Sequence, residues 1–171
     1  MRRRKNTWKG LAAGAAGGFA ATVAMSQFQK LWSAVQSKIE KNSGNRGGGR
    51  KQSDEPATVK AAEALSTNFA GHHLTKSEKK KAGPAVHYAF GTANGMLYGA
   101  LSEHMPKSRL GYGSVFGAGL WAVADEFLVP AFGFSKPVAE YPASTHLYGL
   151  VSHLVYGVVT DRVSRGIRAL V

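Results

Sequence analysis

Four apolar stretches dominate the pattern of hydrophobic and polar residues along the chain. They cover residues 11–31, 84–101, 110–129 and 144–160. An α-helix needs about 20 residues to cross the ~30 Å hydrocarbon core of a bilayer, and each stretch is close to that length. Trp8 and Trp32 flank the first stretch and Tyr112 lies at the start of the third, as aromatic residues at a membrane interface do. The pattern therefore predicts four transmembrane helices.

Small residues recur every four positions within these stretches, and residues four apart share one face of a helix. In lipid there is no hydrophobic drive between helices, so they associate through close backbone approach over small residues. A core formed in water would fill the same positions with larger side chains. We therefore predict an all-α membrane protein, a bundle of about four transmembrane helices packed through small-residue (GxxxG-type) faces. The predicted helix-packing residues are Gly14, Gly18, Gly91, Gly95, Gly99, Gly113, Gly117, Gly149 and Gly157.

The alternative to a membrane bundle is a soluble helical domain rich in alanine and glycine. The stretch "SVFGAGLWAVADEFLVPAFGF" argues against it, because no face of useful width is polar. Two further alternatives concern the N-terminus. "MRRRK" followed by an apolar stretch fits a cleaved signal peptide, with Ala24-Met25-Ser26 as an acceptable cleavage site, and an arginine-rich start without acidic residues also fits a transit peptide.

Polar and basic segments divide the chain around the apolar stretches. We expect a basic flank at residues 1–9, a first transmembrane helix at 10–32, a basic flexible loop at 33–82, three further transmembrane helices at 83–161 and a basic tail at 162–171. Within the loop, "NSGNRGGGRKQS" (42–53) has the composition of a flexible linker. A short amphipathic helix is expected near 55–70, with Asp54 as N-cap, Pro56 in the first turn and Gly71 as the stop.

The charge of the 171-residue chain is unevenly distributed. The formal net charge is +12, and residues 1–82 hold 16 Lys/Arg against 5 acidic residues, whereas residues 83–171 hold 6 against 5. A basic segment beside a bilayer attracts anionic lipids, by about 1 kcal/mol for each Lys or Arg near the surface. Ala61, Leu65 and Phe69 share one face of the expected loop helix and would rest on the membrane. We expect a lipid bilayer, and anionic lipids through the basic loop, as partners. Nucleic acid is an unlikely partner because no aromatic interleaving or known module accompanies the basic residues.

The Lys and Arg residues of the loops and termini also indicate how the chain is oriented in the membrane. With the N-terminus in the cytoplasm, the inside segments hold 10 Lys/Arg and the outside segments 12. Long polar loops count weakly in the positive-inside rule, so we expect an even number of spans with both termini in the cytoplasm.

Several ionisable residues lie within or near the apolar stretches, where such residues are costly and usually functional. The candidate intramembrane polar site consists of His87, Asp125, Glu126, His146 and His153, with Glu103 and Asp161 nearer the ends. His153 lies in the middle of its stretch, between Gly149 and Gly157 on one helical face. The simpler interpretation is that each histidine only donates a hydrogen bond to a neighbouring backbone.

The sequence offers no catalytic residue, cofactor or metal site. It has no cysteine, which excludes disulfides, thiolate ligands and cysteine nucleophiles. It has no G-x-S-x-G, P-loop or H-E-x-x-H motif. Two facing histidines could bind haem, but His87 is expected near one membrane surface and His153 near the middle, which argues against a shared haem.

The chain resembles the YagU-type family of small bacterial inner-membrane proteins. The resemblance rests on "MSQFQKLW" after the first glycine-rich stretch, on "HYAFGTANGMLYGAL" and on "HLYGLVSHLVYG". It implies a multi-pass protein of the bacterial cytoplasmic membrane, and it brings no reaction and no catalytic residue.

Two functions follow from these expectations. The first is a non-enzymatic membrane protein with a structural, partner-binding or lipid-binding role, in which homo-oligomers and hetero-oligomers are both open. The second is a pathway for protons or small ions through the intramembrane histidine and aspartate residues.

Overall fold

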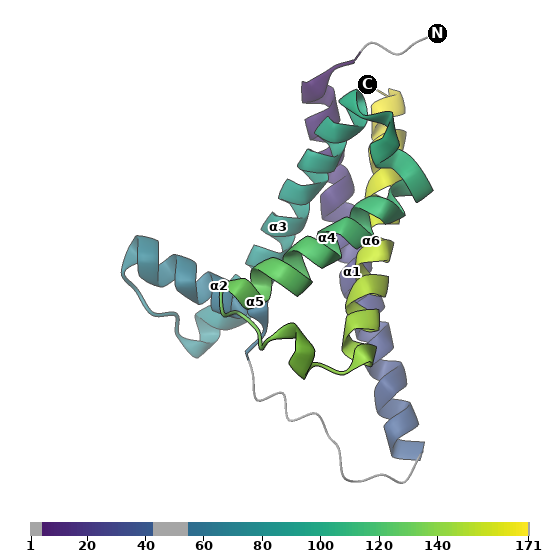
Figure 1. Cartoon of the computed structure of the whole chain (residues 1–171). Coiled ribbons are helices and arrows are strands. Elements are labelled where there is room, and N and C mark those ends of the chain that lie inside the picture. Colours follow the sequence, from purple (N-terminus) through teal and green to yellow (C-terminus); the bar gives the residue numbers. More distant parts are fainter. Residues whose placement is uncertain (1–4, 43–54, 171) are drawn as a thin grey trace.

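The computed structural model describes residues 5–42 and 55–170, and Figure 1 shows the chain. The described residues are almost entirely helical and contain no β-strand, so the predicted all-α class is confirmed. The elements in order are α1 (Thr7–Asn42), α2 (Ala57–Leu65), the π-helix η1 (Ser66–Ala70), α3 (Lys76–His104), the 3-10 segment η2 (Pro106–Gly113), α4 (Ser114–Val123), the π-helix η3 (Ala124–Leu128), α5 (Val129–Ala131), η4 (Val138–Glu140) and α6 (Ala143–Leu170).

Helix α1 is the centre of the fold and packs against both α3 and α6, while α4 packs on α6 from another side. Both α3 and α6 run antiparallel to α1. Gly10 of α1 faces Gly99 of α3 and Gly18 faces Gly91, while Gly17 faces Ser164 of α6. The start of α1 and the end of α6 consequently lie at the same end of the molecule (Figure 1).

The α1–α3 interface is a contact between two backbones. A Cβ atom added at Gly14, Gly18 or Gly95 would lie within 3.0 Å of main-chain atoms of the facing helix. At the α4–α6 interface, Gly113 and Gly117 face Gly157 in the same way. Glycine is the residue that permits this approach, because any side chain would separate the helices.

The remaining predicted packing glycines lie in several settings. Gly91 faces the side chain of Thr22, and a Cβ at Gly99 would meet Gly14 Cα at 2.8 Å. Gly149 faces the side chains of Trp121 and Asp125 instead of a helix backbone.

Helix boundaries differ from the expected ones in three places. Helix α1 runs on to Asn42, because residues 33–42 contain neither glycine nor proline. Helix α3 begins at Lys76 and not near 83, because Thr75 and Glu78 form a capping box. Helix α6 continues to Leu170, so the predicted tail at 162–171 is helical up to that residue.

The α2–η1 segment corresponds to the short helix expected near 55–70. It packs on α3, with Ala62 buried and Val59 next to Gly83. Gly71 ends it in the left-handed conformation (φ 63°), as expected of a C-terminal stop. Pro56 precedes the helix, and the predicted N-cap Asp54 and residues 43–53 of the linker lie outside the described residues.

Two helical segments among the described residues are long and apolar enough to cross a membrane, Thr7–Ile39 and Lys107–Ala131. The helices at 76–104 and 143–170 do not meet this criterion, because their apolar stretches are interrupted by histidine, tyrosine and glycine. Length and hydropathy therefore identify two candidate spans among the described residues, and not the four that the sequence pattern predicted. Two such segments are weak indications of a membrane protein, since the first lies near the N-terminus, where signal sequences have the same character.

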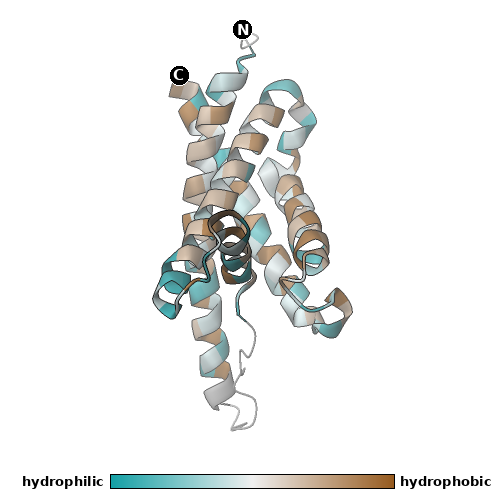
Figure 2. Cartoon of the chain, turned by 90° about the vertical axis from the view of Figure 1, so that its left-hand side faces the viewer, coloured by the Kyte–Doolittle hydropathy of each residue, from teal (hydrophilic) through white to brown (hydrophobic). Residues whose placement is uncertain are grey.

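The interior contains as many polar as apolar side chains. The buried polar residues are Thr22, Ser152, His153, Thr160, Asp161, Ser164 and Arg168. The apolar cluster is small and centres on Ala21, Met25 and Tyr156. Large apolar side chains are instead exposed on the helices, among them Phe19, Phe90, Leu97, Val123, Phe127 and Leu147. Hydrophobic residues accordingly recur along the whole length of the helices in Figure 2.

Candidate functional site

A histidine–carboxylate group lies where α4 and η3 meet α6. His153 Nδ1 is 3.5 Å from Asp125 Oδ2 and 3.0 Å from the carbonyl oxygen of Gly149. A carbonyl oxygen only accepts hydrogen bonds, so Nδ1 carries the proton and donates. The side chain of His153 is only 8% exposed. The hydrogen bond to Gly149 stays within α6 and does not reach the backbone of a neighbouring helix, and the nearby carboxylate adds an electrostatic partner.

A second histidine–carboxylate pair lies next to the first along α6. His146 Nδ1 is 2.8 Å from Glu126 Oε1. In a regular α-helix, adjacent residues point 100° apart, so Asp125 and Glu126 would face different directions. Both residues lie in the π-helix η3, and both carboxylates nevertheless contact histidines of α6. The sequence did not indicate this π-helix, a feature that is frequent at functional sites.

His87 lies at the level of His153, which corrects the expected difference in depth. The Tyr156 hydroxyl, one turn after His153, donates to the carbonyl oxygen of Gly91, one turn after His87, at 2.5 Å. His87 and His153 are also close enough for their charges to interact. The expected difference in depth assumed that the helix begins close to His87. Because α3 starts at Lys76, His87 is its twelfth residue, and His153 is similarly the eleventh residue of α6. His87 Nε2 is buried and has no hydrogen-bond partner among the described residues.

The structure thus places the five predicted polar residues in two neighbouring groups. Asp125, His153 and His87 form one, and Glu126 with His146 forms the other. No group of three or more His, Asp or Glu residues in the described chain has the arrangement of a metal site.

A further polar cluster, of which the sequence indicated only Glu103 and Asp161, lies at the end of the molecule where α1 begins and α6 ends. Arg168 binds Glu103 through two contacts, Nε to Oε1 at 2.7 Å and Nη2 to Oε2 at 3.1 Å. The backbone N–H of Asn6 also donates to Glu103, at 2.9 Å. Glu103, near the end of α3, therefore joins the start of α1 to the last turn of α6.

Asp161 is fully buried in the same cluster. It accepts a hydrogen bond from Tyr98 Oη at 2.5 Å and one from Arg165 Nε at 2.9 Å. Arg165 follows Asp161 by four residues, which is a pairing that a sequence can indicate. Tyr98 comes from another helix, and no local pattern indicates that contact.

A cavity of about 10 Å³, enough for roughly one water molecule, lies among these side chains. Two buried atoms on its wall, Arg109 Nε and Ser164 Oγ, have no hydrogen-bond partner within the described chain, while Asp161 Oδ2 lies 2.8 Å from Arg165 Nε in an ion pair. Arg109 Nη2 donates to Ser102 Oγ at 3.2 Å.

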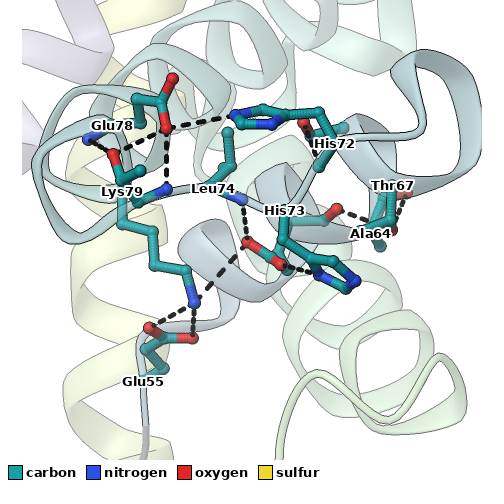
Figure 3. A network of polar contacts seen from close by, with 11 residues as sticks. Glu55, Ala64, Thr67, His72, His73, Leu74, Glu78 and Lys79 are labelled. Carbon is teal, nitrogen blue, oxygen red and sulfur yellow. Dashed lines mark hydrogen bonds and ion pairs between the residues drawn. The ribbon is translucent and has the colours of Figure 1, made fainter.

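A third network ties the α2–η1 segment to the start of α3 (Figure 3). Lys79 Nζ lies 3.1 Å from Glu55 Oε1 and 3.6 Å from Glu63 Oε2. Glu63 also contacts His73 Nδ1 at 2.9 Å and accepts from the Leu74 N–H at 3.1 Å. This network fixes the position of a segment that the sequence indicated only as a short helix in a flexible loop.

The capping box of α3 belongs to the same network. Glu78 Oε2 accepts hydrogen bonds from the Thr75 hydroxyl and the Thr75 N–H, both at 2.7 Å, and lies 3.3 Å from His72 Nε2. The hydroxyl of Thr75, followed by its backbone N–H, lowers the pKa of Glu78 to about 2. The pKa of Glu63 is lowered as well, chiefly by the hydrogen bond from His73.

Comparison with known families places the chain in a family without an assigned activity. The family model "Protein of unknown function (DUF1440)" matches residues 31–162, and the chain belongs to this family. The match includes both histidine–carboxylate pairs, Asp161 and the α2–η1 segment. No curated protein and no solved structure matches the chain.

Proposed function

We propose that this protein is a multi-pass helical protein of the bacterial cytoplasmic membrane with a non-enzymatic role, structural or in binding a partner or lipid. The observation that carries the proposal is the distribution of side chains. Asp161, Thr160 and Ser152 are 0% exposed, whereas Phe127 and Phe132 are each 67% exposed. In water, the hydrophobic effect favours the opposite arrangement.

The helix interfaces support the same proposal. The α1–α3 contact buries almost no large apolar surface, because glycines form its centre. An interface of this kind gains little from the hydrophobic effect, but in lipid it allows close van der Waals packing. The segment at 107–131 adds a further argument, because only 11% of its most apolar window is buried against the rest of the chain.

The α2–η1 segment supports contact with the membrane surface. Its Ala62 faces α3, while Leu65 and Phe69 are 52% and 86% exposed. Lys76 and Lys80 follow closely at the start of α3 and are also exposed. Apolar side chains next to lysines suit a bilayer surface that contains anionic lipids.

A topology measurement tests the multi-pass proposal. Reporter fusions at residue 1, at residue 171 and within residues 43–54 should place both termini in the cytoplasm and the internal site outside. Four spans require the two termini to share a compartment. A cytoplasmic reporter at all three positions would contradict the proposed topology.

A pathway for protons or small ions is the second candidate function. It is favoured by the proximity of Asp125 to His153, by the nearby Glu126–His146 pair, and by the unpartnered Nε2 of His87. Titratable groups facing one another within a bundle are typical of proton relays. Protein in liposomes with a pH-sensitive dye should then dissipate a pH gradient, and His153→Leu should abolish this flux. The absence of flux in the parent protein would refute this second function.

A further inference from the structure

We propose that the junction of η2 and α6 is a binding site for the phosphate group of an anionic phospholipid. The proposal rests on the proposed membrane function and assigns a specific lipid site to it. The site lies apart from the basic loop at residues 33–82. Its cationic residues are Lys107 and Arg109 of η2 and Arg162 of α6.

The first argument is an excess of positive charge. Glu103 and Asp161 are the carboxylates of this region, and each is already bound, to Arg168 and Arg165 respectively. No carboxylate within the described chain forms an ion pair with Lys107, Arg109 or Arg162. Three cations therefore remain uncompensated where η2 packs against α6.

The second argument is that Arg109 has an unused donor. Its Nε is buried without a partner, although its Nη2 is held by Ser102. A guanidinium group binds phosphate best through two parallel N–H donors. The adjoining cavity of about 10 Å³ has room for a single oxygen atom beside Nε. Ser164, 5% exposed, adds to the wall of this cavity a hydroxyl that has no hydrogen-bond partner in the described chain and can donate to the same oxygen.

The third argument is the strained backbone of η2. Tyr112 has φ 55°, between Gly111 (φ 61°) and Gly113 (φ 88°). A bulky residue at positive φ is an outlier, and such strain tends to occur at binding sites. The strained turn holds the Tyr112 ring beneath two guanidinium groups, with Arg162 Cζ 4.6 Å and Arg165 Cζ 5.8 Å from its centroid. Arg162 is thereby oriented at the edge of the site.

The surroundings favour a lipid over a soluble phosphate. Leu110 and Val115, each 57% exposed, lie next to the cations along the chain and offer an apolar surface for an acyl chain. Lys107 and Arg109 also lie between the apolar stretches at 84–101 and 110–129, and Arg162 directly follows the one at 144–160. In the proposed topology these cations lie at the depth of the cytoplasmic headgroups, where anionic lipids are concentrated.

Native mass spectrometry of the full-length protein in detergent tests the site, with phosphatidylglycerol as the probe. The variant is Arg109→Gln/Arg162→Gln. The control is Lys30→Gln/Lys136→Gln, which removes the same charge from exposed positions outside both the junction and the basic loop. At about fivefold per cation, corresponding to ~1 kcal/mol each, the site variant should bind phosphatidylglycerol about 25-fold more weakly than the parent. The control should retain one tightly bound phosphatidylglycerol. Equal binding by the site variant and the parent would overturn the proposal.

Three further measurements remove the remaining ambiguity. Phosphatidylcholine and inorganic phosphate should each bind the parent far more weakly, and equal binding of either would overturn the assignment to an anionic lipid. If Arg109→Gln disturbs folding, Arg162→Gln alone should still lose about fivefold, because Arg162 is exposed. Partitioning in Triton X-114 separates the two proposals. A protein found in the aqueous phase contradicts the membrane function, whereas a detergent-phase protein with unchanged binding in the site variant refutes only the lipid site.

Discussion

Replacing Gly95 with alanine tests whether backbone contact holds α1 to α3. The added Cβ would lie within 3.0 Å of Gly14 and Gly18 main-chain atoms, which cannot move as a flexible side chain could. Glycine to alanine gains about 1 kcal/mol of helix propensity. Overpacking nevertheless costs about 1–3 kcal/mol in total, because the two helices must separate.

Gly119 provides the matched control, since an added Cβ there meets no atom within 4 Å. Gly119→Ala should therefore gain up to about 1 kcal/mol from helix propensity alone. At about 2–4 °C per kcal/mol for a protein of this size, Gly95→Ala should lower Tm by about 2–12 °C and Gly119→Ala should raise it slightly. Tm is measured in the same detergent for both variants.

A larger side chain sharpens the comparison. Gly95→Leu should lower Tm further than Gly95→Ala, whereas Met96→Leu should have little effect, because Met96 is 38% exposed and a Met–Leu exchange conserves volume. If Gly95→Leu and Met96→Leu melt at the same temperature, the helices do not depend on the glycine contact and the packing argument is refuted.

Three further predictions concern the polar groups. His153→Leu should lower Tm, because it removes a buried imidazole that donates to the Gly149 carbonyl and lies beside Asp125, whereas His146→Leu at the more exposed pair should do little; an unchanged Tm in His153→Leu contradicts this. Glu103→Gln should destabilise the protein by about 3–5 kcal/mol in thermal or denaturant unfolding, because it removes the charged partner from a buried, two-contact ion pair with Arg168, and an unchanged Tm would refute the role of this pair. The folded-state pKa of Glu78 is lowered to about 2, so the stability that Glu78 contributes is complete above its ordinary pKa of 4.5 and is lost as the pH falls toward 2. Amide hydrogen exchange at the capped start of α3 should therefore accelerate as the pH falls over that range. Glu78→Gln should remove this pH dependence of the exchange rate.

The sequence allowed the all-α class and the positions of the long helices to be predicted, because hydropathy and the four-residue glycine repeat are local patterns. It did not allow the helix partners to be predicted. That Gly95 faces Gly14 and Gly18 follows from the tertiary arrangement alone. The start of α3 was also missed, although the capping box formed by Thr75 and Glu78 is visible in the sequence.

The polar sites show the same division between local and tertiary information. The ionisable residues of the apolar stretches could be selected from the sequence because charge within such a stretch is unusual. Their pairing joins η3 to α6 across the fold, so no local pattern in the sequence could indicate it. The Glu103–Arg168 and Tyr98–Asp161 contacts join residues 65 and 63 positions apart, so periodicity within one helix could not indicate them.

Extraction of isolated membranes with alkaline carbonate tests the central claim, that the chain is integrated in a bilayer. The treatment releases peripheral and soluble proteins, whereas helices that cross the bilayer stay in the membrane. We expect the full-length protein in the membrane pellet, together with a known integral protein as marker. Recovery of the protein in the supernatant would contradict the account.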